Sequence, residues 1–381
     1  MRVKLGEVCK VVSGTTPKSS CPEYWNGTLN WVTPAELKDD SDIVYETERK
    51  ITLRAVQDTG LKPFPIGTVL LSSRAPIGKV AISGTEMYCN QGFKNLVCSG
   101  SIYNRYLYHF LKDKTEYLNA LGRGATFKEI SKDIVENIEI PLPPLETQRH
   151  IAAVLDKVSA LIAKRRQQLD KLDELVKARF VEMFGDMVSN VNQFSVSQLG
   201  IVCDVRDGTH DTPQYCERGY PLVTSKNVTG GKIDLSSCGF ISEEDFLAIN
   251  KRSKVDEGDI IMPMIGTIGK PVIVSFEPHF AIKNVALIKF PPGAHVKNIY
   301  IKTLLESDYF DRMVLAKIHG GTQKFISLGY IRNLKIAIPP IDLQNQFAAF
   351  VTQTEKTKAA VQQALEKLET MKKALMQEYF G

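Results

Sequence analysis

The fold of this chain is decided by residues 143–185, which read PPLETQRHIAAVLDKVSALIAKRRQQLDKLDELVKARFVEMFG. The window 145–184 contains neither Gly nor Pro, the two residues that most destabilise a helix interior. Pro143 and Pro144 stand where a helix begins, and Gly185 stands where a left-handed cap would end it. The stretch therefore predicts one unbroken helix, about 60 Å long at 1.5 Å per residue.

The same pattern recurs at the end of the chain, where 341–380 again lacks Gly and Pro. Three pairs of segments match at a constant offset of 196 positions: GRGATFKEIS (122–131) and IHGGTQKFIS (318–327), IPLPPLETQ (140–148) and IAIPPIDLQ (336–344), and LDKLDELVKARFVEMFG (169–185) and LEKLETMKKALMQEYFG (365–381). Two upstream pairs match at offsets of 194 and 191: KLGEVCKVVSGTTP (4–17) and QLGIVCDVRDGTHDTP (198–213), and APIGKVAI (75–82) and GTIGKPVI (266–273). The chain is therefore a tandem duplication whose loops differ in length.

Apolar residues in both windows follow the three- and four-residue steps of a coiled coil. The alternative is an ordinary amphipathic helix packed on its own domain, but such a helix would be longer than the domain. We therefore expect the two helices to pack on each other as a spacer. The residues expected in this contact are Val154, Val158, Leu161, Leu169, Leu172, Phe350, Val361, Leu365, Leu368 and Leu375.

Each copy begins with about 140 residues rich in Gly, Pro and β-branched side chains, typical of a mixed α and β domain with short strands. Two pairs of strands flank Ile-Gly-Lys turns, and a helical stretch follows each pair. The expected strands are 67–72, 79–83, 258–262 and 271–275, and the expected helical stretches are 103–121 and 298–317.

Composition bounds the class of protein. The 381 residues are 43% apolar and 24% charged, as in an ordinary globular protein, and no stretch resembles a membrane helix or a signal peptide. Seven cysteines without a Cys-x-x-Cys pair argue against a disulfide framework and a zinc ribbon, so we expect a reduced cytoplasm. The net charge of +5 permits nucleic-acid binding without requiring it.

No pattern predicts catalysis or a metal site. A phosphate-binding loop needs Gly-Lys followed by Ser or Thr, but Lys79 precedes Val80 and Lys270 precedes Pro271. The six histidines form no metal-binding pair, and neither a Gly-x-Ser-x-Gly elbow nor an Asn/Asp-Pro-Pro-aromatic motif of adenine methyltransferases occurs. We therefore predict a non-catalytic binding or bridging protein.

Three sets of polar loops occupy matching places in the two copies. Gly, Arg, Lys and Thr suit phosphate contacts, and Asn, Gln and Lys suit base edges, although such loops also serve as plain turns or solvated surface. The candidate DNA-binding residues are Thr15, Lys18, Arg74, Asn90, Gln91, Lys94, Arg123, Thr126, Lys128, Thr209, His210, Thr212, Lys226, Lys283, Asn284, Thr322, Gln323 and Lys324.

The chain resembles the specificity subunit of type I restriction–modification systems. The resemblance rests on G-[G/A]-T-x-K-x-I-S, then I-x-[I/L]-P-P-[L/I]-x-x-Q, then a long helix ending in Phe-Gly, all occurring twice, and on DGTHDTP at 207–213. The first copy departs from the last motif, since it reads only Gly-Thr-Thr-Pro at 14–17.

The resemblance implies an α+β fold with two target-recognition domains and two long helices that form an antiparallel coiled coil, related by a pseudo-two-fold axis. The segments it implies are a first recognition domain at 1–142, a spacer helix at 143–185, a linker at 186–195, a second recognition domain at 196–338 and a second spacer helix at 339–381.

It also implies the function and the partners. Each domain would read half of a bipartite target on double-stranded DNA, and the helices would set the spacer and dock two methyltransferase subunits. S-adenosylmethionine, ATP and Mg²⁺ would belong to methyltransferase and restriction subunits, with no cofactor in this chain. The alternatives are a subunit of a methylation-only or type II-like system, a fused enzyme, and a coiled-coil bridging protein that does not bind DNA.

Overall fold

The computed structural model describes residues 1–381 apart from 39–41, 75, 125–127, 267 and 315–324. The chain forms two compact units. Unit 1 comprises Met1–Arg166 and Gln363–Gly381, and unit 2 comprises Gln167–Gln362. Each unit therefore holds one globular part, the beginning of the long helix that follows it, and the end of the other long helix.

The two long helices occupy the windows predicted from the sequence: α6 is Leu145–Phe184 and α12 is Ile341–Phe380. The Pro144 carbonyl accepts the first helical bond, from the Gln148 N–H at 3.0 Å. At the other end, Gly185 has φ +76°, a conformation that favours glycine. Its N–H donates to the Val181 carbonyl at 2.8 Å, so α6 ends where a glycine cap was expected.

In unit 1, strand β1 (Arg2–Lys4) pairs antiparallel with β10 (Glu139–Pro141). A five-stranded sheet has the order β2-β9-β6-β7-β4, and a three-stranded sheet has the order β5-β3-β8. These strands are β2 (Cys9–Val12), β3 (Trp25–Val32), β4 (Ile43–Val44), β5 (Lys50–Ile51), β6 (Val69–Leu71), β7 (Val80–Ser83), β8 (Tyr88–Cys89) and β9 (Asn95–Cys98).

Unit 2 repeats this plan. Strand β11 (Ser195–Gln198) pairs antiparallel with β21 (Lys335–Ile338), and the sheets have the orders β12-β20-β17-β18, β16-β13-β19 and β14-β15. These strands are β12 (Asp204–Asp207), β13 (Tyr220–Val223), β14 (Val228–Thr229), β15 (Lys232–Ile233), β16 (Gly239–Ile241), β17 (Ile260–Pro263), β18 (Val272–Ile273), β19 (Ala281–Ile282) and β20 (Val285–Lys289). The antiparallel pairs β6·β7 and β17·β18 confirm the predicted strands around the Ile-Gly-Lys turns.

The shorter helices correct one expectation. Within the described residues, the predicted helical stretches are each divided in two, because Lys114 has ψ 16° and Ser307 has extended ψ 167°, which interrupt the helical backbone. Positions 315–317 of the second stretch lie outside the described residues. The resulting pairs are α3 (Asn104–Asp113) and α4 (Thr115–Leu121), and α9 (Asn298–Leu305) and α10 (Asp308–Met313). The others are α1 (Leu5–Val8), α2 (Leu53–Thr59), α5 (Lys132–Glu136), α7 (Leu199–Val202), α8 (Glu243–Ser253) and α11 (Leu328–Arg332), with 3-10 turns η1 (Pro22–Tyr24) and η2 (Ser225–Asn227).

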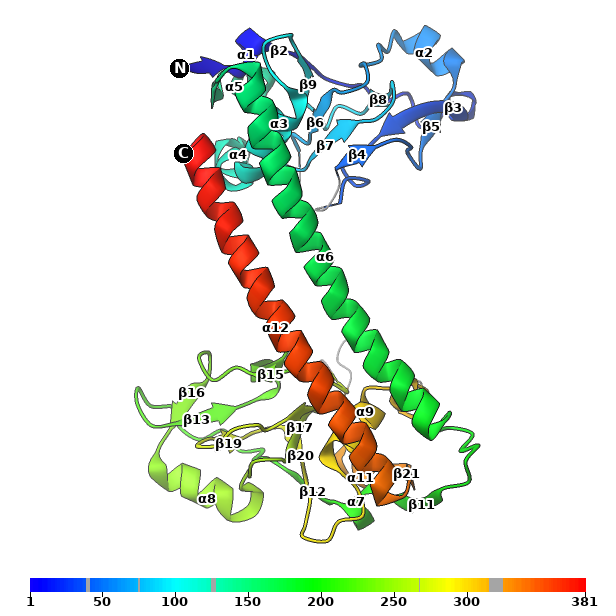
Figure 1. Ribbon diagram of the computed structural model, residues 1–381, viewed down its shortest axis with the longest axis vertical. Helices are drawn as coiled ribbons and strands as arrows, with labels where there is room; N and C mark the ends of the chain where they lie inside the picture. The colour runs from blue at the N-terminus through cyan, green and yellow to red at the C-terminus, as the bar shows by residue number, and fades with distance from the viewer. Residues whose placement is uncertain (39–41, 75, 125–127, 267, 315–324) are drawn as a thin grey trace. The chain divides into compact units, whose positions relative to one another are not determined.

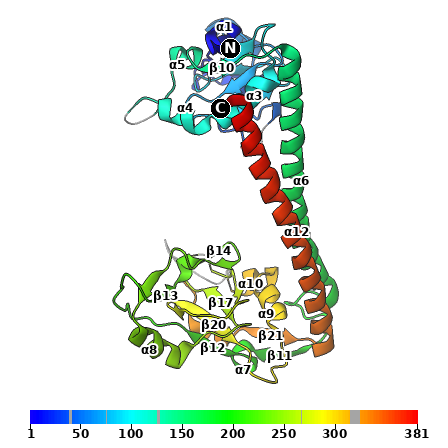
Figure 2. The ribbon, with the colours of Figure 1, turned by 60° about the vertical axis from the view of Figure 1, so that its left-hand side comes forward.

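The ends of the long helices belong to the two hydrophobic cores. In unit 1, the start of α6 and the end of α12 lie beside α3 (Figure 1). Leu155 of α6 and Phe380 of α12 are buried with α3, and the Phe380 ring lies 5.1 Å from that of Tyr106. In unit 2, Phe184 of α6 lies 5.4 Å from Phe347 of α12. Figure 2 shows α9 and α10 between the β12-β20-β17-β18 sheet of unit 2 and helix α12. Burial of these large side chains attaches each helix end firmly to its unit.

Candidate nucleic-acid interface

In each unit, a pair of parallel strands leads into candidate loops at its carboxyl end. In unit 1, β3 runs parallel to β8 with Val32 opposite Cys89. In unit 2, β13 runs parallel to β19 with Val223 opposite Ile282. Because parallel strands end at the same edge, the loops that leave them lie side by side.

A third loop joins the same edge in both units. The Thr15 N–H donates to the Cys89 carbonyl at 3.1 Å, and the Thr209 N–H donates to the Ile282 carbonyl at 3.0 Å. The preceding glycines, Gly14 and Gly208, lie so close to these same carbonyls that a Cβ would collide with backbone. Glycine is thus needed for close approach, which explains why the Gly-Thr dipeptide occurs in both copies.

Side chains then join the loops. The Thr16 hydroxyl donates to Gln91 Oε1 at 2.5 Å in unit 1. In unit 2, His210 Nδ1 lies 3.0 Å from Asn284 Oδ1, and Lys283 Nζ donates to the Thr212 hydroxyl. We call residues 14–18 and 90–92 the first loop cluster, and residues 208–212, 225–226 and 283–284 the second loop cluster. The structure thus brings together two candidate sets that lie far apart in the sequence.

Two tryptophans hold the first loop cluster, and the sequence analysis did not single them out. The indole N–H of Trp31 donates to the Thr15 carbonyl, and that of Trp25 donates to the Lys18 carbonyl, both at 3.3 Å. The Arg49 guanidinium lies 4.2 Å from the Trp25 ring centroid and 5.0 Å from that of Trp31. The sequence signal was available, because the chain's two tryptophans both fall in one copy.

The basic candidates of unit 1 gather around an acid that the sequence analysis also missed. Glu129 accepts from Arg74 Nε at 2.9 Å and from Lys94 Nζ at 3.1 Å, and its backbone pairs with that of Arg123. Although burial alone raises the pKa of Glu129, the bonds from Lys94 and Arg74 outweigh it and hold that pKa below its ordinary value. Lys94 is 8% exposed, so it acts as a structural cation rather than a surface one.

The Glu129 group adjoins the first loop cluster, because the Ser73 N–H donates to the Gly92 carbonyl at 2.7 Å. At the matching place in unit 2, Ile265 forms an isolated antiparallel bridge with Phe325, as Arg74 does with Glu129. The Phe325 side chain is 53% exposed. At equivalent positions, unit 1 therefore has an ionic group and unit 2 has an apolar one.

The remaining candidates fall into three groups. Lys18, Arg123, Lys128 and Lys226 are exposed, as phosphate-binding side chains need to be. The side chain of Asn90 is already engaged, since its Oδ1 accepts from the Gly92 N–H at 2.9 Å. Four candidates lie outside the described residues: Thr126, Thr322, Gln323 and Lys324.

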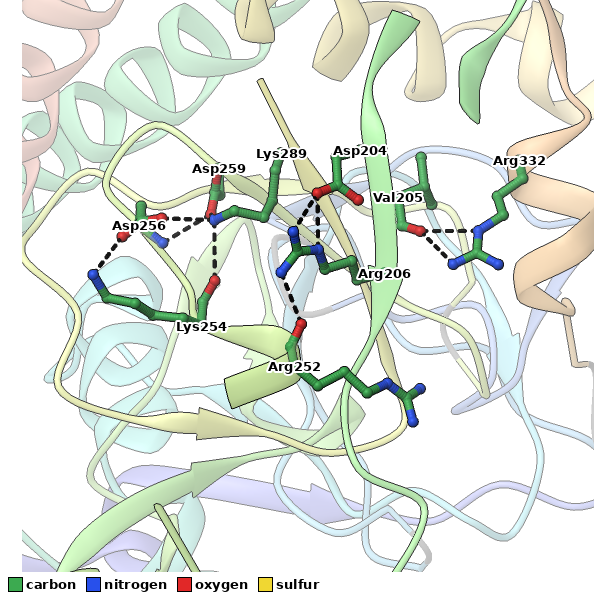
Figure 3. A network of polar contacts seen from close by, with 9 residues as sticks. All are labelled: Asp204, Val205, Arg206, Arg252, Lys254, Asp256, Asp259, Lys289 and Arg332. Atoms are coloured by element: carbon green, nitrogen blue, oxygen red, sulfur yellow. Dashed lines mark hydrogen bonds and ion pairs between the residues drawn. The ribbon is translucent and has the colours of Figure 1, made fainter. Parts of the chain in front are cut away.

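Polar contacts fix the carboxyl end of helix α8 (Figure 3). Arg206 of β12 donates to the Arg252 carbonyl at 2.8 Å, and Lys289 of β20 donates to the Lys254 carbonyl at 3.0 Å. These cations lie at the carboxyl end of α8, where the helix dipole favours positive charge. The Arg252 side chain in turn binds Asp207, which immediately precedes Gly208.

A buried glutamine attaches each long helix to its unit. Gln148 is fully buried; its Oε1 accepts from the Tyr103 N–H at 2.8 Å, and its Nε2 donates to the Ser101 and Pro143 carbonyls. Gln344 repeats the pattern, accepting from the Lys297 N–H at 2.8 Å and donating to the His295 and Pro339 carbonyls. The glutamine that ends the repeated Pro-Pro motif therefore secures the helix start.

Contacts between the long helices occur within each unit. Arg166 of α6 bonds Glu369 of α12 at 2.7 Å in unit 1, and Lys358 of α12 bonds Asp173 of α6 at 2.6 Å in unit 2. The helix-contact candidates that are fully or partly buried are Val154, Val158, Leu169, Leu172, Phe350, Val361, Leu365, Leu368 and Leu375. Leu161 differs, with 38% exposure, because the buried row passes through Val158 and Ile162 instead.

Residues 1–174 and 192–370 both match the family model described as "Type I restriction modification DNA specificity domain". The chain belongs to the type I restriction–modification DNA specificity family. The two matched segments correspond to the two copies of the duplication, so this family's domain occurs twice.

Relatives in this family match along most of the chain. The type I restriction enzyme MjaIX specificity subunit of Methanocaldococcus jannaschii is 31% identical, over 91% of this chain and 85% of that protein. The MjaVIII specificity subunit of the same organism is 25% identical, over 98% and 90%. The crystal structure of a type I restriction–modification S subunit from M. genitalium covers 100% of this chain and 96% of its own, with TM-score 0.59 and 15% identity.

A second solved structure extends this likeness in fold. It comes from work on complex assembly and conformational transition of the type I R-M system, and it covers 100% of this chain and 97% of its own. Its TM-score is 0.62 at 18% identity. These family members confirm the predicted fold class, with duplicated α and β domains and long helices.

Proposed function

We propose that this chain is the DNA-binding specificity subunit of a type I restriction–modification complex. The observation that carries the proposal is the duplicated loop cluster, a polar, glycine-dependent edge built on parallel strands in both units. Exposed Lys and Arg side chains beside amide groups suit a surface that contacts phosphates and reads base edges. The family and the names of the relatives support the same function.

In this proposal the recognition domains are 1–142 and 196–338, and each reads one half of a bipartite target on double-stranded DNA. The linker 186–195 joins the first helical segment to the second domain. The differences between the loop clusters support two different half-sites. The helical segments 143–185 and 339–381 set the spacer between the half-sites, because a helix holds its length along its axis. Their buried glutamines support this role, since a spacer must be firmly attached at its base.

The chemistry is proposed to reside in partners. Two methyltransferase subunits that use S-adenosylmethionine would dock on the helices and domains, and restriction subunits that use ATP and Mg²⁺ would join them. This chain would contribute recognition alone, in the cytoplasm. The free state of all seven cysteines supports a reducing compartment, and no helix in the described part of the chain is long and apolar enough to cross a membrane.

The test is methylation of a DNA library by purified components. The chain, its methyltransferase and the complex of both are each incubated with S-adenosylmethionine, and methylated adenines are mapped by sequencing. We expect methylation at one bipartite motif with the complex only. Methylation by the chain alone would make it an enzyme, and a motif that is unchanged when the chain is omitted would remove its role in specificity. Addition of restriction subunits and ATP then distinguishes a restriction system from a methylation-only one by cleavage.

A further inference from the structure

The second loop cluster contains a histidine held between two oxygen atoms. His210 Nδ1 lies 3.0 Å from Asn284 Oδ1, and His210 Nε2 lies 2.8 Å from Asp207 Oδ2. A ring nitrogen donates to an oxygen only when it carries a proton, so with Asn284 Oδ1 facing the ring both nitrogens are protonated. The bonds to Asn284 and then to Asp207 accordingly raise the pKa of His210 above its ordinary value.

Charged groups surround this histidine on the elements that meet there. Asp207 ends β12 and is bound by Arg252 of α8, whose positive charge opposes protonation of His210. Lys283, in the loop after β19, is bound to the Thr212 hydroxyl, and Asp211 follows His210 in the chain. Lys226 of η2 is exposed beside the same edge. Asp207 therefore favours the protonated ring, and the charge of Arg252 opposes it.

The backbone of Asn284, the partner of the histidine, is held by two hydrogen bonds. Asn284 has φ +55°, a conformation that Asn and Asp tolerate better than other residues. Its N–H donates to the Thr209 carbonyl at 3.3 Å, and its carbonyl accepts from the Ser225 hydroxyl at 3.2 Å. Rotation of the side-chain amide is therefore the way in which this residue can respond to its neighbour.

When the His210 ring loses one proton, Nδ1 needs a hydrogen-bond donor opposite it instead of an acceptor. The bond from Nε2 to the Asp207 carboxylate is charge-assisted and keeps its proton, so Nδ1 becomes the acceptor. Asn284 Oδ1 then faces a lone pair, and rotation of the amide by half a turn places Nδ2–H on Nδ1 instead. Before the rotation, the NH₂ group of Asn284 is available to donate a hydrogen bond to a ligand. After the rotation, the side-chain carbonyl of Asn284 is available to accept one.

We propose that His210 determines whether Asn284 offers a hydrogen-bond donor or an acceptor to DNA, so that the base preference within one half-site changes with pH. The inference rests on the proposed function, because it needs the second loop cluster to face bases. In the protonated state the Asn284 amide selects acceptor edges, as on guanine. In the neutral state its carbonyl selects donor edges, as on cytosine N4 or adenine N6.

The first loop cluster provides an internal control. Its equivalent pair is Thr16 and Gln91, in which a hydroxyl donates to Oε1 at 2.5 Å. Neither group titrates near neutral pH, so the orientation of the Gln91 amide is independent of proton concentration. The half-site read by unit 1 should therefore keep its sequence at every pH at which the protein is folded.

The experiment selects randomised DNA duplexes with the full chain assembled with its methyltransferase subunits. Selections at about pH 6 and about pH 9 span an ordinary and a raised imidazole pKa. We expect one position in one half-site to change its preferred base, by about tenfold in relative enrichment, while the other half-site stays constant. Enrichment of the same motif at both pH values overturns the switch, and so does a change in both half-sites.

Two variants sharpen the result. His210→Gln cannot titrate and should abolish the pH dependence; if the change persists in this variant, the switch is wrong. Asn284→Asp is acceptable at φ +55° and offers only acceptors, so it should select a donor edge at both pH values. If no duplex is enriched at either pH by any form of the complex, the proposed DNA-reading function itself fails, which separates the two failures.

Discussion

At the scale of single residues, the ionic group of Arg74, Lys94 and Glu129 shows that a Lys or Arg predicted to bind DNA can instead stabilise the folded domain. Lys94 is buried and Arg74 is half exposed, and both are bound to Glu129. Sequence reasoning recognised the cations because Lys and Arg are common DNA ligands, but nothing in the sequence pairs them with an acid 35 or 55 positions away. The pairing exists only because Ser73–Arg74, Lys94 and Glu129 meet in the folded domain.

Replacing Glu129 by Gln should destabilise unit 1. The change leaves the buried Lys94 ammonium without its charge partner, and we expect the free energy of unfolding to fall by about 1–3 kcal/mol in chemical denaturation at neutral pH. Because the folded pKa of Glu129 is depressed, this stabilisation exists above its unfolded pKa and disappears as the pH falls through the folded one. The exposed Glu86→Gln is the control; equal losses in both variants would contradict the argument.

The tryptophans should act as a reporter of one half-site. Both lie under the first loop cluster and bond its carbonyls, so a ligand that settles on this loop should change their emission. We expect duplexes with an intact half-site for unit 1 to shift tryptophan fluorescence, and duplexes with only the other half-site to leave it unchanged. Trp25→Phe, which removes the bond to the Lys18 carbonyl, should reduce the signal. An equal response to both half-sites would refute the assignment.

At the scale of elements, the long helices were the most predictable part of the chain. Their bounds follow from the absence of Gly and Pro and from the caps, which act locally. The division of 103–121 into α3 and α4 was not predictable, since Lys is an ordinary helix former and no local pattern predicts the ψ of 16° at Lys114. The role of the motif glutamine was equally hidden, because two of its three bonds, to Lys297 and His295, reach another part of the domain.

Gln344→Leu should weaken the attachment of α12. The substitution keeps the volume but leaves the Lys297 N–H and two carbonyls without partners in a buried site, so we expect a loss of about 2–4 kcal/mol in the free energy of unfolding. Gln346→Leu, on the exposed side of the same helix, is the matched control and should change stability by less than about 0.5 kcal/mol. Equal losses of unfolding free energy in the two variants would show that the buried hydrogen bonds of Gln344 do not contribute to stability.

Helix length should set the spacer of the target. Removing one heptad from 155–175 together with the matching heptad from 351–371 shortens both helices by about 10 Å and preserves the heptad pattern. We expect the methylated motif to keep both half-sites and change the number of unspecified base pairs between them, as read by sequencing methylated DNA. Deletion of four residues from each helix, which breaks the heptad, should abolish assembly. An unchanged spacer after the heptad deletion would exclude the helices as its determinant.

At the scale of the whole molecule, the duplication makes two readers whose details differ. The first loop cluster is braced by indole and guanidinium groups, and the second by His210, Asp207 and Arg252. The shared features are backbone features, such as the Gly-Thr contacts with Cys89 and Ile282. The differing features are side chains, some of them buried, as Trp31 is, and some exposed, as His210 is. This is the pattern expected when one fold serves two recognition sequences.

Exchange of one copy should change one half of the target. Replacing 1–142 with the corresponding domain of another specificity subunit leaves 196–338 intact, so we expect a new first half-site and an unchanged second half-site in the methylated motif. The reciprocal exchange of 196–338 is the control and should change the other half only. Alteration of both halves by a single exchange would contradict the assignment of one domain to one half-site.

The sequence by itself determined the duplication, the two long helices and their caps, because these depend on repeats, local propensity and spacing along the chain. It also located the candidate loops, since Gly, Thr, Asn and Lys gather there in both copies. Only the tertiary structure decided which loops meet, which acids neutralise which bases, and that His210 and Asn284 form a pair 74 positions apart. Those pairings depend on parallel strands and buried contacts between distant segments, which no local pattern in the chain encodes.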